Sequence, residues 1–139
     1  MNLRLFASVG VLLAALIASA IATNNRSYGP NEYVTILGGR SPDHKYSIAA
    51  HGSGELGNDN FHLYLMNAAT GKKIGPLEEI KDTLDTGADA FYAKWSADSK
   101  EVRIRYRVDR HEALEVGYRV DNGRATLSKL PAKADGLSF

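Results

Sequence analysis

The chain has 139 residues, of which 17 are Lys or Arg and 16 are Asp or Glu, and it contains no cysteine. A chain of this length is within the usual size of one domain and can bury a core without disulfide bonds. The near balance of charge argues against a nucleic-acid-binding protein, and the lack of cysteine excludes a disulfide framework, a thiol nucleophile and a thiolate metal site.

The first 22 residues have the pattern of a secretory signal peptide. Arg4 supplies a positive charge, residues 5–17 are almost wholly apolar, and Ala20-Ile21-Ala22 fits the small-x-small pattern before a cleavage site. The alternative is an uncleaved membrane anchor, because the apolar run approaches the roughly 20 residues that span a bilayer. Cleavage would leave a single β domain, residues 23–139, with 16 acidic residues and, after the loss of Arg4 from the 17 basic ones, 16 basic residues.

The absence of cysteine also bears on the compartment. Small secreted domains of animals usually carry disulfide bonds, so we expect a bacterial protein that is periplasmic or secreted. Once the signal is removed, no transmembrane segment is expected in the rest of the chain.

Beyond residue 22, apolar residues recur at every second position and turn-forming clusters separate the runs, which predicts an all-β domain of antiparallel meander type, such as a small sandwich. Only residues 77–84 have a helical period, which predicts at most a short helix or turn. Residues 131–139 are small and polar and are expected to form a loose tail. The predicted strands are residues 33–37, 45–51, 61–67, 90–96, 101–108, 113–120 and 125–130.

Three of these strands can be registered from the sequence. In residues 101–108 and 113–120 the apolar side chains all have even numbers, so both strands can turn one face to a core. Pairing residues 90–96 in the same way places Tyr92 and Lys94 beside the arginines of the other face. The predicted core anchors are Phe61, Leu63, Leu65, Phe91, Trp95, Ile104, Tyr106, Val116 and Tyr118. The predicted outer face carries Tyr92, Lys94, Arg103, Arg105, Arg107 and Arg119, with Glu115 among them.

Two parts of the chain repeat. Residues 41–50 align with residues 96–105, and residues 63–72 align more loosely with residues 116–124, which predicts one supersecondary unit used twice. In each copy a Ser-x-Asp-x-Lys turn precedes a strand, and a later strand ends in a Gly-basic turn. The first copy, with Ser41-Pro42-Asp43-His44-Lys45 and Thr70-Gly71-Lys72, resembles the blade repeat of TolB-type and WD-repeat-like β-propellers; the second copy has Ala97 in place of the proline.

The resemblance implies two propeller-like blades. A propeller usually needs at least four blades to close. The alternatives are therefore an open sandwich of two blades, a ring of several chains, or hairpins that share only their turn chemistry.

The stretch Leu84-Asp85-Thr86-Gly87-Ala88-Asp89 resembles the catalytic turn of retropepsin-type aspartic proteases. Such enzymes bring two Asp-Thr/Ser-Gly turns together so that two carboxylates share one proton. This chain has a single copy, so catalysis by Asp85, Thr86 and Gly87 would need a homodimer, and no Gly-rich flap follows. We favour the alternative interpretation, a loop that leads into the strand of residues 90–96.

The arginine face is the most informative candidate site. Successive residues on one side of a strand are about 6–7 Å apart, so Arg103, Arg105 and Arg107 repel one another unless anionic groups face them, and Glu115 can pair with only one. Guanidinium groups bind carboxylates and phosphates bidentately. The alternative is a solvated face whose arginine stems cover neighbouring surface.

Metal sites are less well supported. The loop of residues 52–62 offers Glu55, Asp59 and Asn60 but lacks the spacing of a known calcium loop, and the four histidines lack zinc-site spacing. No metal and no cofactor are predicted.

We therefore expect an exported, non-enzymatic binding or accessory protein of the bacterial cell envelope that docks an anionic ligand, or an unknown envelope protein, on its arginine face. One rival function is the homodimeric aspartic protease. The other is a structural protein that adds an edge strand, for which residues 33–37 are the candidate, to an envelope assembly.

Overall fold

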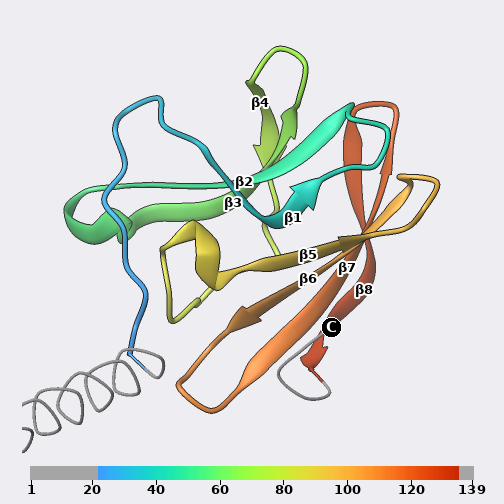
Figure 1. Cartoon of the computed structure of the whole chain (residues 1–139). Helices are drawn as coiled ribbons and strands as arrows, with labels where there is room; N and C mark the ends of the chain where they lie inside the picture. Colours follow the sequence, from blue (N-terminus) through green and yellow to red (C-terminus); the bar gives the residue numbers. More distant parts are fainter. Residues whose placement is uncertain (1–21, 135–139) are drawn as a thin grey trace, which may run out of the picture.

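The structure, a computed structural model, describes residues 22–134, which form one curled sheet of eight strands (Figure 1). The strand order is β4-β3-β2-β1-β5-β6-β7-β8, and every neighbouring pair is antiparallel except β1 and β5, which are parallel. The sheet curls into a half-barrel, which confirms the predicted all-β fold. The elements are β1 (Val34–Arg40), β2 (Tyr46–Ser53), the 3-10 helix η1 (Glu55–Gly57), β3 (Asp59–Asn67), β4 (Lys72–Pro76), the 3-10 helix η2 (Ala88–Ala90), β5 (Tyr92–Trp95), β6 (Glu101–Arg107), β7 (Ala113–Asp121) and β8 (Arg124–Lys133).

The registers of β5, β6 and β7 are the predicted ones. Ile104 lies opposite Val116 and Ala93, and Arg103 lies opposite Gly117 and Lys94. The sequence sets this register because side chains alternate between the two faces, so a slip of one residue would expose every apolar side chain of the strand.

The core lies on the inner side of the curl and draws on both halves of the sheet. Of the predicted core anchors, Phe61 and Trp95 are only half-buried at its margin, and the other seven are buried. At this margin the indole Nε1 of Trp95 donates to the Gly39 carbonyl at 3.0 Å. A smaller apolar cluster lies on the outer side of the first half of the sheet and consists of Ala49, Tyr64 and Met66, with Tyr33 packed against it.

The two halves of the sheet meet at a bulge in β1. Gly38 has a left-handed backbone with φ of 68°, and a Cβ there would lie 2.2 Å from the Ala93 carbonyl oxygen, so only glycine fits. The bulge also shifts the alternation of side chains between the two faces of β1. Thr35 pairs with Ala49 and Arg40 pairs with Ser47, and Ala49 and Ser47 lie on the same face of β2. An odd-numbered and an even-numbered residue of β1 therefore share one face. As a result Arg40 lies on the outer face beside β5.

The two Ser-x-Asp-x-Lys turns are built alike. In each, the serine hydroxyl donates to the aspartate carboxylate at 2.6 Å, from Ser41 to Asp43 and from Ser96 to Asp98. These hydroxyl bonds are the main cause of a lowered pKa for both carboxyl groups. The Asp43 amide also donates to the Ser99 hydroxyl at 3.0 Å, so the two turns lie side by side.

Several expectations about the strands are wrong. The strand of residues 33–37 is not an edge, because β1 lies between β2 and β5, and the edges of the sheet are β4 and β8. β4 was not expected because "KKIGP" has no period-two alternation and ends in proline. Residues 131–133 of the expected loose tail belong to β8, where Ala132 pairs with Glu115, and residues 135–139 lie outside the described part of the chain.

Residues 77–84 form turns rather than a helix. Their helical spacing arises because Leu77 and Ile80 both enter the core, where they are 2% and 1% exposed, from a loop between β4 and η2. Burial of two side chains three positions apart therefore imitated a helix period here.

Candidate functional site

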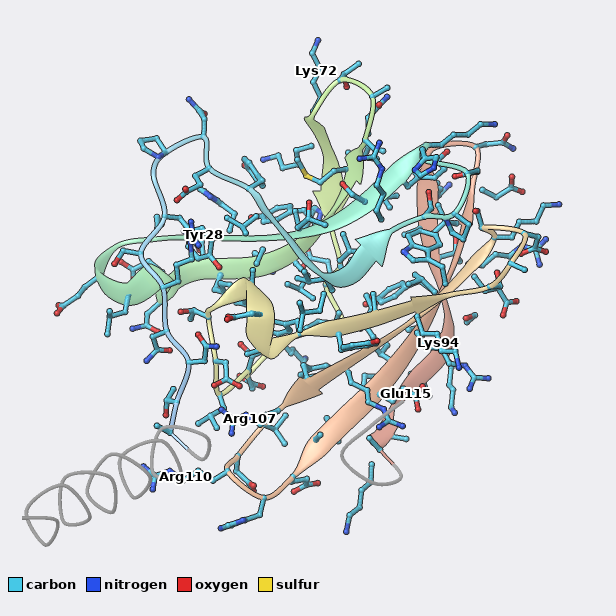
Figure 2. The ribbon with its side chains drawn as sticks, viewed as in Figure 1. Tyr28, Lys72, Lys94, Arg107, Arg110 and Glu115 are labelled. Atoms are coloured by element: carbon cyan, nitrogen blue, oxygen red, sulfur yellow. The ribbon has the colours of Figure 1, made fainter. Side chains whose placement is uncertain are left out.

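Asp85 forms a buried ion pair that fastens the start of the described chain to the sheet. Its carboxylate is 1% exposed and accepts hydrogen bonds from Arg107 Nε at 2.8 Å, Arg107 Nη2 at 2.7 Å and the Asn24 backbone amide at 2.8 Å. Arg107 also donates to the Ala22 carbonyl at 3.0 Å, and Figure 2 shows this arginine near the beginning of the N-terminal segment. The hydrogen bonds that Arg107 donates to the Asp85 carboxylate raise the pKa of Arg107 above its ordinary value.

The next two residues of the Asp-Thr-Gly stretch hold the same segment. The Thr86 hydroxyl donates to the Leu56 carbonyl at 2.6 Å and accepts from the Arg26 amide at 3.0 Å. The Gly87 amide donates to the Asn24 carbonyl at 2.9 Å, and a Cβ on Gly87 would lie 2.0 Å from Asn24 Oδ1. We call Asp85, Thr86, Gly87 and Arg107 the N-terminal clamp.

The clamp accounts for the protease-like sequence in structural terms. The stretch is a loop leading into β5, but it is buried, because Asp85, Thr86 and Gly87 each bind backbone atoms of residues 22–26. In an aspartic protease the carboxylate must face a water molecule and a second carboxylate. Here both oxygens of Asp85 accept bonds from a guanidinium and one also from an amide, which is the arrangement of an anchoring residue.

The predicted arginine face is only partly available to a ligand. Arg107 belongs to the N-terminal clamp, and its side chain is 24% exposed. Arg105 is half-buried opposite Glu115, and Arg119 is exposed opposite Glu101. Three of the four arginines therefore have a carboxylate bound to them or directly across the strand pair.

Lys94 and Arg103 differ from those arginines. They lie directly opposite each other on β5 and β6, both are exposed, and within residues 22–134 neither forms an ion pair with a carboxylate. Like charges directly opposite on neighbouring strands are destabilising. An anion placed between them would relieve this repulsion.

Arg40 extends this surface in a way that sequence reasoning missed. It is exposed at the end of β1 and, in the described part of the chain, has no ion pair. Its position depends on the Gly38 bulge and on the parallel pairing of β1 with β5, where Leu37 lies opposite Tyr92. Neither feature can be read from local periodicity. We call Arg40, Lys94 and Arg103 the cationic face.

Two shallow hollows flank Lys94 on the cationic face. The first, of about 370 Å³, lies between Arg40 and Lys94, and Tyr92, which is 46% exposed, lines it. We call it the middle hollow, because a third hollow lies on the other side of Arg40. The lower hollow, of about 240 Å³, lies between Lys94 and Arg103 and includes Glu101. Trp95 lines both. Cationic groups beside aromatic side chains can bind a carboxylate or phosphate while also contacting an apolar part of the ligand.

Metal binding and a membrane-spanning helix find less support in residues 22–134. There, no three His, Cys, Asp or Glu side chains gather closely enough to hold a metal ion, and no helix has the length and apolar character needed to cross a membrane. The predicted signal peptide, apart from Ala22, lies outside the described residues.

Comparison of the chain with protein-family models, with curated proteins and with solved structures found no match. Its function has to be inferred from the geometry of its own side chains.

Proposed function

We propose that the protein is an exported, non-enzymatic binding module of the bacterial cell envelope that docks an anionic ligand on the cationic face. The observation that carries the proposal is the direct opposition of Lys94 and Arg103, two exposed cations with no carboxylate bound to either in residues 22–134. Arg107 is excluded from the docking surface because it is needed in the N-terminal clamp.

Export is supported by the signal-like residues 1–22 and by the absence of cysteine. We also infer that the two halves of the sheet, β1–β4 and β5–β8, are propeller-like blades. This inference is supported by the matching hydrogen bonds of the turns at Ser41 and Ser96.

The alternatives have weaker physical support. Both oxygens of Asp85 are occupied by donors, which leaves the protease without a carboxylate facing solvent. The two edges of the sheet carry residues that discourage pairing with another strand, namely Lys72, Lys73 and Pro76 on β4 and Lys129, Pro131 and Lys133 on β8.

The proposal can be tested by retention on a carboxymethyl matrix at pH 7 and low salt. With 16 basic and 16 acidic residues after loss of Arg4 from the 17 basic ones, the chain from residue 23 onward has no formal net charge, so retention must come from a local patch. We expect the double variant Lys94→Glu/Arg103→Glu to elute at clearly lower salt than the wild type.

The matched control is Arg110→Glu/Lys133→Glu, which makes the same change in net charge at exposed positions outside the hollows. Arg110 lies on the β6–β7 hairpin, away from Lys94 (Figure 2). Equal elution of the two double variants would show that retention follows total charge, and the cationic face would be rejected as a docking surface.

A further inference from the structure

The cationic face continues onto the first half of the sheet. An upper hollow of about 430 Å³ lies on the outer side of β1, β2 and β3, and Arg40 lines both this hollow and the middle one. The middle and lower hollows in turn share Lys94 and Trp95. The three hollows therefore follow one another across the outer surface, and we call this row the cross-strand groove. A cation that forms no ion pair within residues 22–134 lies at each junction.

The direction of the groove limits the shape of its occupant. It runs across β6, β5, β1, β2 and β3, which are consecutive neighbours in the sheet. Adjacent strands are about 4.8 Å apart, so the groove extends over roughly 19 Å. An extended linear molecule matches this path, whereas a compact ligand would fill one hollow and leave the other two empty.

The lining indicates the chemistry of that molecule. The upper hollow combines Tyr33 with the neutral polar residues Asn31, Thr35 and Ser47. Tyr33 is held in place by stacking on His51, with ring centroids 4.3 Å apart, and by an edge contact with Tyr64 at 5.3 Å. A rigid aromatic wall beside neutral hydrogen-bonding groups suits a ring that is apolar on its face and carries hydroxyl groups at its edge.

Glu101 indicates that the ligand carries hydrogen-bond donors beside its anionic groups. Its carboxylate lines the lower hollow together with Lys94 and Arg103. A polymer that offered only anionic groups to this hollow would be repelled there, because one anionic group would meet another. A ligand that alternates hydroxyl and carboxylate groups can donate to Glu101 and still pair with the two cations.

We propose that the occupant of the cross-strand groove is a linear acidic polysaccharide, with uronate carboxylates at Arg40 and between Lys94 and Arg103 and with sugar rings in the hollows. This inference rests on the proposed function, since it names the ligand of the same cationic face. It adds that binding depends on chain length and on Arg40.

Calorimetric titration at constant ionic strength tests this with digalacturonate, hexagalacturonate and a hyaluronan hexasaccharide. The dimer is short enough to use Lys94 and Arg103 alone, whereas a hexamer can reach Arg40. We expect at least one of the two hexasaccharides to bind more tightly than digalacturonate. We expect Arg40→Ala to weaken hexamer binding about tenfold, as for loss of one charged hydrogen bond, and to leave dimer binding nearly unchanged. Arg110→Ala, an exposed arginine outside the groove, serves as the control and should bind like the wild type.

Three further probes separate this inference from the proposed function. The methyl ester of hexagalacturonate keeps the rings without the charge and should bind far more weakly than the acid. Equal or tighter binding of hexaglutamate or of a thymidine hexanucleotide would overturn the polysaccharide while leaving anion docking intact. The polysaccharide would also be overturned if no uronate bound, although the carboxymethyl matrix still retained the protein through Lys94 and Arg103. Anion docking would again stay intact. Loss of both kinds of binding would overturn both proposals.

Discussion

The N-terminal clamp makes a quantitative prediction about stability. Replacing Asp85 by Ala removes the acceptor of three hydrogen bonds and leaves the Arg107 guanidinium without its counter-charge. Removing one partner of a buried ion pair costs about 3–5 kcal/mol. Because the Arg107 side chain remains 24% exposed and can be partly solvated, we expect the lower end, about 3 kcal/mol.

Thermal and urea denaturation followed by circular dichroism measure this loss. At about 4 °C per kcal/mol for a domain of this size, Asp85→Ala should lower Tm by about 12 °C. Asp89→Ala is the matched control, because Asp89 is an exposed carboxylate that accepts a hydrogen bond from the Asn24 side chain at 2.8 Å. An exposed contact of this kind contributes about 1 kcal/mol or less.

A double-mutant cycle makes the test specific to the ion pair. If Asp85 and Arg107 act as a unit, Asp85→Ala/Arg107→Ala should be little less stable than either single variant. The clamp would be refuted if Asp85→Ala cost no more than Asp89→Ala, or if the effects of the two single variants simply added. An Asp85→Asn variant of normal stability that had lost an acid protease activity would instead favour the catalytic interpretation.

Three further predictions concern the fold. Gly38→Ala should lower the free energy of unfolding by at least about 2 kcal/mol, because the new Cβ adds a contact of 2.2 Å with the Ala93 carbonyl to the strain of a left-handed backbone. Gly71→Ala is the control, with φ of 70° and open space around it, and should cost only about 1 kcal/mol. Equal losses of stability in urea denaturation would contradict this account of the bulge. The lowered pKa of Asp43 and Asp98 means that their stabilisation is complete above about pH 4 and is lost as the pH falls through the lower folded-state values. Unfolding free energies measured from pH 5 to pH 2 should therefore fall less steeply in Asp43→Asn/Asp98→Asn than in the wild type, and parallel curves would refute the role of these turns. Burial raises the pKa of Tyr28 to about 12, so its stabilisation is present below the ordinary tyrosine pKa near 10 and is lost as the pH rises through 12. Tyr28→Phe should remove one late-titrating tyrosinate signal from an absorbance titration, whereas an unchanged high-pH phase would assign that signal elsewhere.

Local periodicity was sufficient to predict the part of the sheet with one buried and one solvated face. In β6 and β7 the alternation of apolar and charged residues set the register, so the positions of Lys94 and Arg103 followed directly. β4 could not be found in this way, because all but one of its residues are exposed and no buried face imposes a pattern.

Long-range partners could not be predicted from one sequence. The anchoring role of Asp85 depends on Arg107, which lies 22 positions later, and on Asn24, which lies 61 positions earlier. Arg40 joins the cationic face because Gly38 allows β1 to bulge beside β5. Both cases require knowledge of which distant segments meet, and no local propensity contains that information.

The separation of the clamp's two sides also determines the order of assembly. Ala22 is 85 positions from Arg107 and Asn24 is 61 positions from Asp85, so the first contact needs β6, whereas the second needs the chain only as far as residue 85. In a chain that emerges with its N-terminus first, the ion pair of Asp85 and the bond to the Ala22 carbonyl therefore stay unformed until Arg107 has followed. Closure of the clamp then comes late in folding, after the β6 strand that carries Arg107 is in place.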